Sequence, residues 1–202
     1  AALLGPLGRP TSIRGTNGEK PGRVVCVGGG IGVAPMHPIA QALKAAGNDV
    51  TIIMGARNKD LFVMEDEMRA IAGDKLILMT DDGSSGRNGL VTEPLKELCE
   101  RGEVDEVIAI GPPIMMKFCA LTTKPFNVHT TVSLNTIMID GTGMCGGCRI
   151  TVGGETKFVC VDGPEFDAHK VDWDQMTKRM AAFKPQEAAA REHVCKAGIF
   201  TK

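Results

Sequence analysis

The chain has 202 residues, of which 43% are hydrophobic and 23% charged, and its formal net charge is −1. These values are typical of a globular protein large enough for one or two small hydrophobic cores. The balanced charge excludes a strongly basic surface, so we expect no nucleic-acid partner. We expect no membrane span and no signal peptide, because no apolar run approaches about 18 residues. Seven cysteines, an odd number, argue against a complete disulfide framework and indicate a reducing compartment, the cytoplasm.

Residues 1–22 are rich in glycine and proline and show no hydrophobic period, so we interpret them as a connector. From Arg23 onwards, short apolar runs alternate with stretches of helical spacing. The predicted strands are Val24–Val27, Val50–Met54, Leu76–Met79, Val107–Ile110 and Val128–Val132, and the predicted helices are a stretch ending at Gly47, then Glu65–Ala72, Glu93–Arg101 and Ile114–Leu121. This alternation predicts an α/β fold with a five-stranded parallel, doubly wound domain at 23–133.

The pattern changes after residue 133, where shorter elements replace the alternation of strands and helices. The predicted elements are a β-hairpin made of Arg149–Val152 and Lys157–Val161 around a Gly153-Gly154 turn, a helix over Asp172–Phe183 with Asp172 as its N-cap, and a helix with a tail from Pro185. We therefore divide this part into a small hairpin domain at 134–170 and a C-terminal helix and tail at 171–202.

A glycine-rich loop joins the first predicted strand to the first predicted helix. Backbone N–H groups and the helix dipole favour a phosphate at such a junction. The spacing is not a clean G-x-G-x-x-G, because Val33 stands where the third glycine is expected, and a structural turn remains the alternative. The candidate nucleotide-binding residues of the loop are Gly28, Gly29, Gly30, Ile31, Gly32, Ala34 and Pro35.

A second polar segment follows the third predicted strand, at the end of the sheet where ligands bind in doubly wound folds. Its candidate ribose contacts are Thr80, Asp81, Asp82 and Ser84, although an Asp/Gly turn has the same composition. A carboxylate at this position suits ribose hydroxyls and repels a 2′-phosphate, so we expect NADH to be preferred over NADPH. Arg87 could reverse this preference, because it lies only five residues beyond Asp82.

A third segment, after the fourth predicted strand, contains Gly111, Pro112 and Met115. Its glycine and prolines let the backbone approach a flat ring such as a nicotinamide, although they also suit a simple helix start. These three residues complete the candidate nucleotide site.

The most informative stretch is DGTGMCGGC, followed by a further cysteine twelve residues later. Its spacing matches the C-x4-C-x2-C…C loop of plant-type [2Fe–2S] ferredoxins, except that Asp140 stands in place of the first cysteine. The candidate metal ligands are Asp140, Cys145, Cys148 and Cys160. A zinc site with the same four ligands and purely structural cysteines both remain open. Cys26, Cys99 and Cys119 lie in strand or helix patterns, and we interpret them as buried small apolar residues.

These motifs together resemble a known superfamily. GGGIGVAP, GAR at Gly55–Arg57, TDDGSSG at Thr80–Gly86 and IGPPIMM at Ile110–Met116 resemble the pyridine-nucleotide domain of the ferredoxin–NADP reductase superfamily. With the cysteine loop and FVCVDGPEFDAHKVDW at Phe158–Trp173, the chain looks like the small electron-transfer subunits of NADH-dependent ferredoxin:NADP oxidoreductases, also called sulfide dehydrogenase small subunits. The electron-transfer subunits of dihydroorotate dehydrogenases are close relatives. The resemblance covers residues 1 to about 180, and the aspartate at position 140 favours the bifurcating ferredoxin:NADP branch.

The resemblance implies NAD(H), FAD and a [2Fe–2S] cluster as cofactors, with Arg57 among the nucleotide contacts and no catalytic acid, base or nucleophile. It implies a larger flavin and iron–sulfur subunit as partner, and ferredoxin as a further one. Such subunits normally begin with a flavin-binding barrel that carries an Arg-x-Tyr-Ser/Thr motif, whereas this chain has no tyrosine. We therefore expect a fragment or a natural truncation in which 1–22 is the remnant of the barrel and the FAD site lies largely outside the chain.

Three alternatives to this interpretation remain open. The chain could be a dihydroorotate dehydrogenase electron-transfer subunit, a non-catalytic nucleotide-binding module with a structural zinc site, or a pure electron carrier. For the partner contact we expect the acidic run at the C-terminal side of the cysteine loop, although a solvated surface has the same composition. The run consists of Glu165, Asp167, Asp172 and Asp174, with Trp173 among them.

Overall fold

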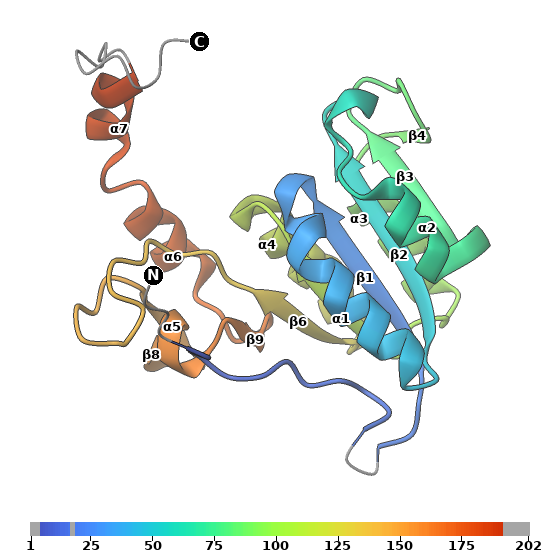
Figure 1. The fold of residues 1–202 in the computed structure, drawn as a ribbon, viewed down its shortest axis with the longest axis horizontal. Coiled ribbons are helices and arrows are strands. Elements are labelled where there is room, and N and C mark those ends of the chain that lie inside the picture. The colour runs from blue at the N-terminus through green and yellow to red at the C-terminus, as the bar shows by residue number, and fades with distance from the viewer. Residues whose placement is uncertain (1–4, 17–18, 192–202) are drawn as a thin grey trace.

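The computed structural model describes residues 5–16 and 19–191. Its centre is a seven-stranded sheet in the order β4-β3-β2-β1-β5-β6-β9 (Figure 1). The strands are β1 (Arg23–Gly29), β2 (Asp49–Ala56), β3 (Leu76–Thr80), β4 (Arg87–Asn88), β5 (Glu106–Ile110), β6 (His129–Ser133) and β9 (Glu165–Asp167). The five predicted parallel strands are confirmed, and the structure adds two short edge strands: β4 pairs parallel to β3, and β9 pairs antiparallel to β6.

Helices cover both faces of the sheet, as the doubly wound prediction requires. Helices α1 (Val33–Ala45) and α2 (Glu65–Ala72) lie on the face turned to the viewer in Figure 1, and α3 (Thr92–Glu100) and α4 (Pro113–Thr123) lie behind the sheet. Each face has its own apolar cluster, because alternate residues of the buried strands point to opposite sides. Cys26 belongs to the cluster beneath α1 and α2, and Cys99 and Cys119 belong to the cluster beneath α3 and α4. Burial raises the pKa of the Cys26 and Cys119 thiols to about 12.

The order of the strands reverses between β1 and β5. The chain runs outward from β1 to β4 on one side, then returns to place β5 and β6 on the other side. In an open parallel sheet this reversal leaves a crevice at the carboxyl ends of the two central strands. Short 3-10 turns η1 (Gly30–Gly32), η2 (Lys59–Leu61), η3 (Gly73–Lys75) and η4 (Lys124–Phe126) complete the connections of this part.

The region after β6 contains the predicted hairpin. Strands β7 (Arg149–Val152) and β8 (Glu155–Phe158) pair antiparallel around Gly153 and Gly154, both of which have positive φ. The prediction that the second strand reaches Val161 is wrong, because a single-turn helix α5 (Val159–Asp162) replaces its last residues. The Asp162 carboxylate accepts a hydrogen bond from the Phe158 N–H at 2.8 Å and so stabilises this turn.

Two helices follow the hairpin. Helix α6 (Trp173–Met180) begins after Asp172, whose carboxylate accepts a hydrogen bond from the Gln175 N–H at 2.9 Å, so the predicted N-cap is confirmed. Helix α7 (Lys184–Arg191) follows in the predicted C-terminal segment. Cys195, for which the sequence offered no partner, lies outside the described residues. Within the described ranges, no helix is both long and apolar enough to cross a membrane.

Candidate functional site

A cavity of about 580 Å³ opens at the carboxyl end of the sheet, where the strand order reverses. The predicted site residues that line this cavity are Gly29, Gly30, Ile31, Arg57, Asp81, Pro112 and Met115. These residues belong to four segments that lie far apart in the chain, and the parallel sheet brings them together because its strand ends meet at one edge. The structure therefore unites the glycine loop, the GAR segment, the aspartate segment and the proline segment around one space.

Two glycines allow the loop after β1 and the loop after β5 to touch. A Cβ on Gly32 would lie 2.4 Å from the Ile110 carbonyl oxygen, and a Cβ on Gly111 would lie 3.1 Å from the backbone of Gly29. Both distances are shorter than ordinary van der Waals contact, so a side chain at either position would push the loops apart. The close approach places Gly30 and Ile31 of η1, the turn that leads into α1, at the cavity.

Several predicted residues do not line the cavity. Thr80 is fully buried, and its hydroxyl donates a hydrogen bond to the Ser85 carbonyl at 2.7 Å. Asp82 accepts a hydrogen bond from the Ser84 N–H at 2.9 Å, and hydrogen bonding from Ser84 lowers the pKa of this carboxylate. The Ser84 hydroxyl in turn accepts from the Lys59 N–H at 2.8 Å. These residues shape the loop around the site. The remaining predicted residues outside the cavity lining are Gly28, Gly32, Ala34, Pro35 and Gly111.

An apolar rim around the cavity was not predicted from the sequence. It consists of Leu61, Val63, Leu90, Val91 and Ile114. Leu90 and Ile114 are each 61% exposed, which is unusual for large aliphatic side chains of a folded protein and indicates a surface for a flat apolar ligand. These residues come from three segments that lie far apart in the sequence, so only the tertiary structure reveals them as a group.

The residue that could have reversed the nucleotide preference is paired elsewhere. The Arg87 guanidinium donates two hydrogen bonds to the Glu97 carboxylate of α3, at 2.9 and 2.5 Å. This interaction raises the pKa of Arg87 and lowers that of Glu97. Asp81 lines the cavity and is exposed. The charged side chains that line the cavity are therefore Asp81 and Arg57, while Arg87 is held by Glu97.

The hairpin brings two of the predicted metal ligands together. Arg149 pairs with Phe158 in the hairpin register, so Cys148 and Cys160 flank its open end. The Cys148 and Cys160 sulfurs lie 3.2 Å apart, and both side chains are buried.

The other two predicted ligands form a second pair on the loop before the hairpin. The Asp140 carboxylate accepts hydrogen bonds from the Thr142 N–H at 3.0 Å and from the Cys145 N–H at 2.8 Å. Hydrogen bonds, the strongest from the Thr142 N–H, lower the pKa of Asp140, so the group is an ionised acceptor. Cys145 is exposed, and its sulfur accepts a hydrogen bond from the Gly147 N–H at 3.3 Å.

The positions of these four side chains can be compared with the needs of the two metal centres that the sequence left open. A single zinc ion requires its ligands to surround one point. In the part of the chain that the structure describes, no three His, Cys, Asp or Glu side chains converge in this way. A binuclear cluster needs only two protein ligands for each metal, and the Cys148 and Cys160 sulfurs form one such pair; Asp140 contacts Cys145 through its backbone N–H.

The acidic run expected to contact a partner has other interactions in the structure. Trp173 is 9% exposed and its indole N–H donates to the Ala168 carbonyl at 3.1 Å. Asp174 pairs with Lys117 at 2.7 Å, and Asp172 caps α6. Instead, large apolar side chains are exposed around the cysteine loop. They are Met138, Ile139, Met144, Val161 and Phe183.

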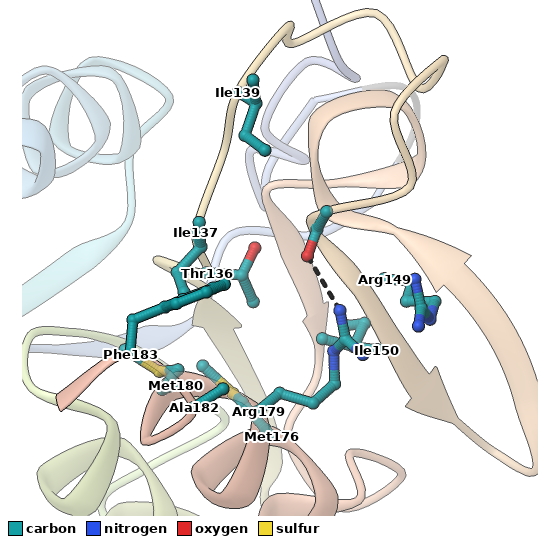
Figure 2. A pocket seen from close by; sticks show the side chains of 11 residues that line it. Thr136, Ile137, Ile139, Arg149, Ile150, Met176, Arg179, Met180, Ala182 and Phe183 are labelled. Carbon is teal, nitrogen blue, oxygen red and sulfur yellow. Dashed lines mark hydrogen bonds between the residues drawn. The ribbon is translucent and has the colours of Figure 1, made fainter. Parts of the chain in front are cut away.

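A second cavity, of about 280 Å³, lies between the cysteine loop and α6 (Figure 2). Ile137, Ile139 and Ile150 line one side, and Met176 and Met180 of α6 line the other. Sequence reasoning missed this cavity, because its two walls come from segments about 40 residues apart.

Comparison with known proteins identifies the two parts of the chain. Residues 26–120 match the oxidoreductase NAD-binding domain family, and residues 135–172 match the iron-sulfur cluster binding domain of dihydroorotate dehydrogenase B. The fold and these matches define the class as an oxidoreductase chain with an NAD-binding and an iron–sulfur part. The chain belongs to the family of dihydroorotate dehydrogenase B electron transfer subunits and their homologues.

Individual relatives cover nearly the whole chain. The dihydroorotate dehydrogenase B (NAD(+)) electron transfer subunit homolog of Thermotoga maritima is 50% identical over 96% of this chain and 66% of its own length. The probable electron transfer subunit of Methanopyrus kandleri is 34% identical over 91% of this chain and 67% of its own length. A chain of the solved NADH-dependent reduced ferredoxin-NADP oxidoreductase is 49% identical, with a TM-score of 0.82 over 94% of this chain and 66% of that one. The chain thus spans about two thirds of the length of these relatives.

Proposed function

We propose that this chain passes electrons between NAD(H), FAD and a [2Fe–2S] cluster, and exchanges them with a larger flavin and iron–sulfur subunit of the ferredoxin:NADP oxidoreductase type. The observation that carries this proposal is the presence, in one chain, of a 580 Å³ cavity at the switch point of the sheet and of four candidate cluster ligands on adjoining segments. The names of the relatives support it.

In this proposal the nucleotide occupies the 580 Å³ cavity. Backbone N–H groups of the glycine loop and the start of α1 hold the pyrophosphate, because the positive end of the helix points there. Asp81 accepts hydrogen bonds from ribose hydroxyls, and Arg57 lies beside it, because Ala56 pairs with Thr80 in the register of β2 and β3. Pro112 and Met115, with the apolar rim, hold the nicotinamide and exclude water from its reactive face.

The second part of the proposal assigns Asp140, Cys145, Cys148 and Cys160 as the cluster ligands. When bound, flavin and cluster supply the change from two-electron hydride chemistry to single-electron transfer. The chain holds the four ligands on a glycine-rich loop and at the end of the hairpin, and the Gly147 N–H donates to the Cys145 sulfur. We propose 23–133 as the nucleotide-binding unit, 134–170 as the cluster unit and 171–202 as the C-terminal helix and tail, with the FAD site largely outside the chain.

We further propose that the larger subunit docks on the exposed apolar residues around the cysteine loop rather than on the acidic run. Apolar side chains with high exposure are common at protein interfaces, and Met144 is 90% exposed while Ile139 is 78% exposed. Ferredoxin is a further partner in this proposal. A cytoplasmic location is part of it as well, since thiolate ligands require a reducing compartment.

The test is to purify the chain anaerobically and measure iron, acid-labile sulfide and zinc, then titrate with NADH by calorimetry. We expect about two irons and two sulfides per chain. Cys148→Ser should lose the cluster, whereas the matched control Cys99→Ser, in a helix outside the loop, should retain it. One zinc without labile sulfide, together with NADH binding, would instead support the nucleotide-binding module with a structural zinc.

A second candidate, the dihydroorotate dehydrogenase electron-transfer subunit, is favoured by the names of the relatives. The activity of the complex with its partner subunit distinguishes the two candidate functions. The complex isolated from the native organism should oxidise NADH with ferredoxin and NADP as acceptors if the first proposal holds. Activity with dihydroorotate and NAD in that complex would support the second.

A further inference from the structure

The turn between Cys145 and Cys148 contains two consecutive glycines, Gly146 and Gly147. Since glycine has no side chain, nothing within these two residues restrains the orientation of their peptide groups. Gly146 has φ of 63°, a conformation that glycine adopts at little cost. The two peptide groups of this turn could therefore rotate easily, unless contacts from outside the turn hold them.

Two arginines make such contacts. The Gly146 carbonyl accepts hydrogen bonds from the Arg149 guanidinium at 3.1 Å and from the Arg149 backbone N–H at 3.4 Å. The Gly147 carbonyl accepts from the Arg179 guanidinium at 3.1 Å, which is the dashed line in Figure 2. Each arginine thus holds one of two successive peptide groups.

Peptide planarity transmits this restraint to the sulfur. In a trans peptide the C=O and the N–H point in opposite directions, so fixing the oxygen also fixes the hydrogen. The peptide whose oxygen binds Arg149 is the one whose N–H, on Gly147, donates to the Cys145 sulfur at 3.3 Å. The peptide whose oxygen binds Arg179 carries the N–H of Cys148, whose direction is fixed in the same way.

Both arginines are themselves fixed by secondary structure. Arg149 is the first residue of β7, which pairs with β8. Arg179 lies on α6, where Met176 and Trp173 are buried against the core. Its guanidinium crosses from the helix to the loop along the wall of the 280 Å³ cavity (Figure 2). Among the described residues, no carboxylate forms a salt bridge with either guanidinium, so both positive charges act on their surroundings uncompensated.

We propose that Arg149 and Arg179 are positioning residues for the iron–sulfur cluster, which orient the two peptide groups of the Cys145–Cys148 turn and raise the cluster's reduction potential. The inference rests on the proposed cluster ligands. Hydrogen bonds from N–H groups to the cysteine sulfurs and nearby positive charge both stabilise the reduced cluster, which carries one more negative charge. Loss of either arginine therefore lowers the potential.

The test is an EPR-monitored redox titration of the full chain and of Arg149→Met, Arg179→Met and the double variant. At a fixed ambient potential, we expect each single variant to lower the ratio of reduced to oxidised cluster by roughly three- to tenfold, as for loss of a charge-assisted hydrogen bond. A tenfold change corresponds to about 59 mV for a one-electron couple. Arg101→Met, at the end of α3 and paired with Glu103, is the matched control and should leave the potential unchanged.

Glutamine variants keep the test decisive if the methionine variants fail to hold the cluster. Arg149→Gln and Arg179→Gln retain a donor for the carbonyl and lose the charge, so their potentials should fall by a smaller amount. Wild-type potentials in both glutamine variants, or in methionine variants with a full cluster, would overturn the inference. Absence of iron and sulfide from the wild-type chain would instead refute the proposed cluster itself.

Discussion

The choice between NADH and NADPH offers the sharpest prediction. Arg87 pairs with Met79 in the register of β4 and β3, and paired residues of adjacent strands point to the same face. Met79 lines the cavity of the proposed nucleotide site, and so does Asp81, which follows the end of β3. We therefore expect the Arg87 side chain to be able to reach the proposed ribose position, but Glu97 holds it with two hydrogen bonds. We predict that Glu97→Gln releases Arg87 and raises the affinity for NADPH.

The magnitude follows from the exposure of the pair. Both side chains are more than 40% exposed, so a released guanidinium interacts with a 2′-phosphate through solvent-screened attraction. An exposed single-charge contact changes a binding constant by up to about fivefold, and a bidentate contact with a doubly charged phosphate by somewhat more. We therefore expect NADPH to bind about five- to tenfold more tightly to Glu97→Gln than to the wild type, with unchanged NADH affinity.

The assay is calorimetric titration of both nucleotides into the two proteins at low and high salt. The gain should shrink from 0.01 M to 1 M ionic strength, because the Debye length falls from about 30 Å to about 3 Å. The double variant Arg87→Gln/Glu97→Gln is the matched control and should bind NADPH as weakly as the wild type. An unchanged NADPH affinity in Glu97→Gln, or an equal gain in the double variant, would refute the reasoning.

Three further predictions concern the loops and the sheet. Gly32→Ala places a Cβ 2.4 Å from the Ile110 oxygen, so the two loops must separate by about 1 Å. Calorimetry should show at least about tenfold weaker NADH binding, and urea unfolding should show a free energy of unfolding lower by about 1–3 kcal/mol. Asp140→Cys should retain the cluster and lower its potential in a redox titration, since thiolate is the more electron-releasing ligand; an unchanged potential would mean that Asp140 only accepts the loop's N–H groups. Asp105 has its pKa lowered from 3.8 to about 2, first by the hydrogen bond from the Arg23 side chain. Its folded-state pKa lies below the unfolded value, so Asp105→Asn should destabilise the protein above about pH 4, and the difference in urea midpoint should vanish as pH falls through about 2.

Much of this molecule is determined by local sequence. The alternation of apolar runs and helical spacing predicted all five parallel strands, because a strand buried on both faces needs a continuous apolar run. The Gly153-Gly154 turn and the Asp172 cap were predicted for the same reason, since both depend on a few neighbouring residues. The spacing of the candidate ligands is also local, and the iron–sulfur family match at 135–172 agrees with the chemistry it indicated.

The tertiary structure alone decided which of these residues meet. The register of the hairpin places Cys148 beside Cys160, and packing of α3 on the sheet places Glu97 beside Arg87. The burial of Trp173 and the attachment of β9 to the edge of the sheet likewise result from pairing between distant segments. Such contacts depend on how whole helices and strands pack against one another. The local sequence does not specify them, because many different partners would satisfy the same hydrophobic and charge pattern.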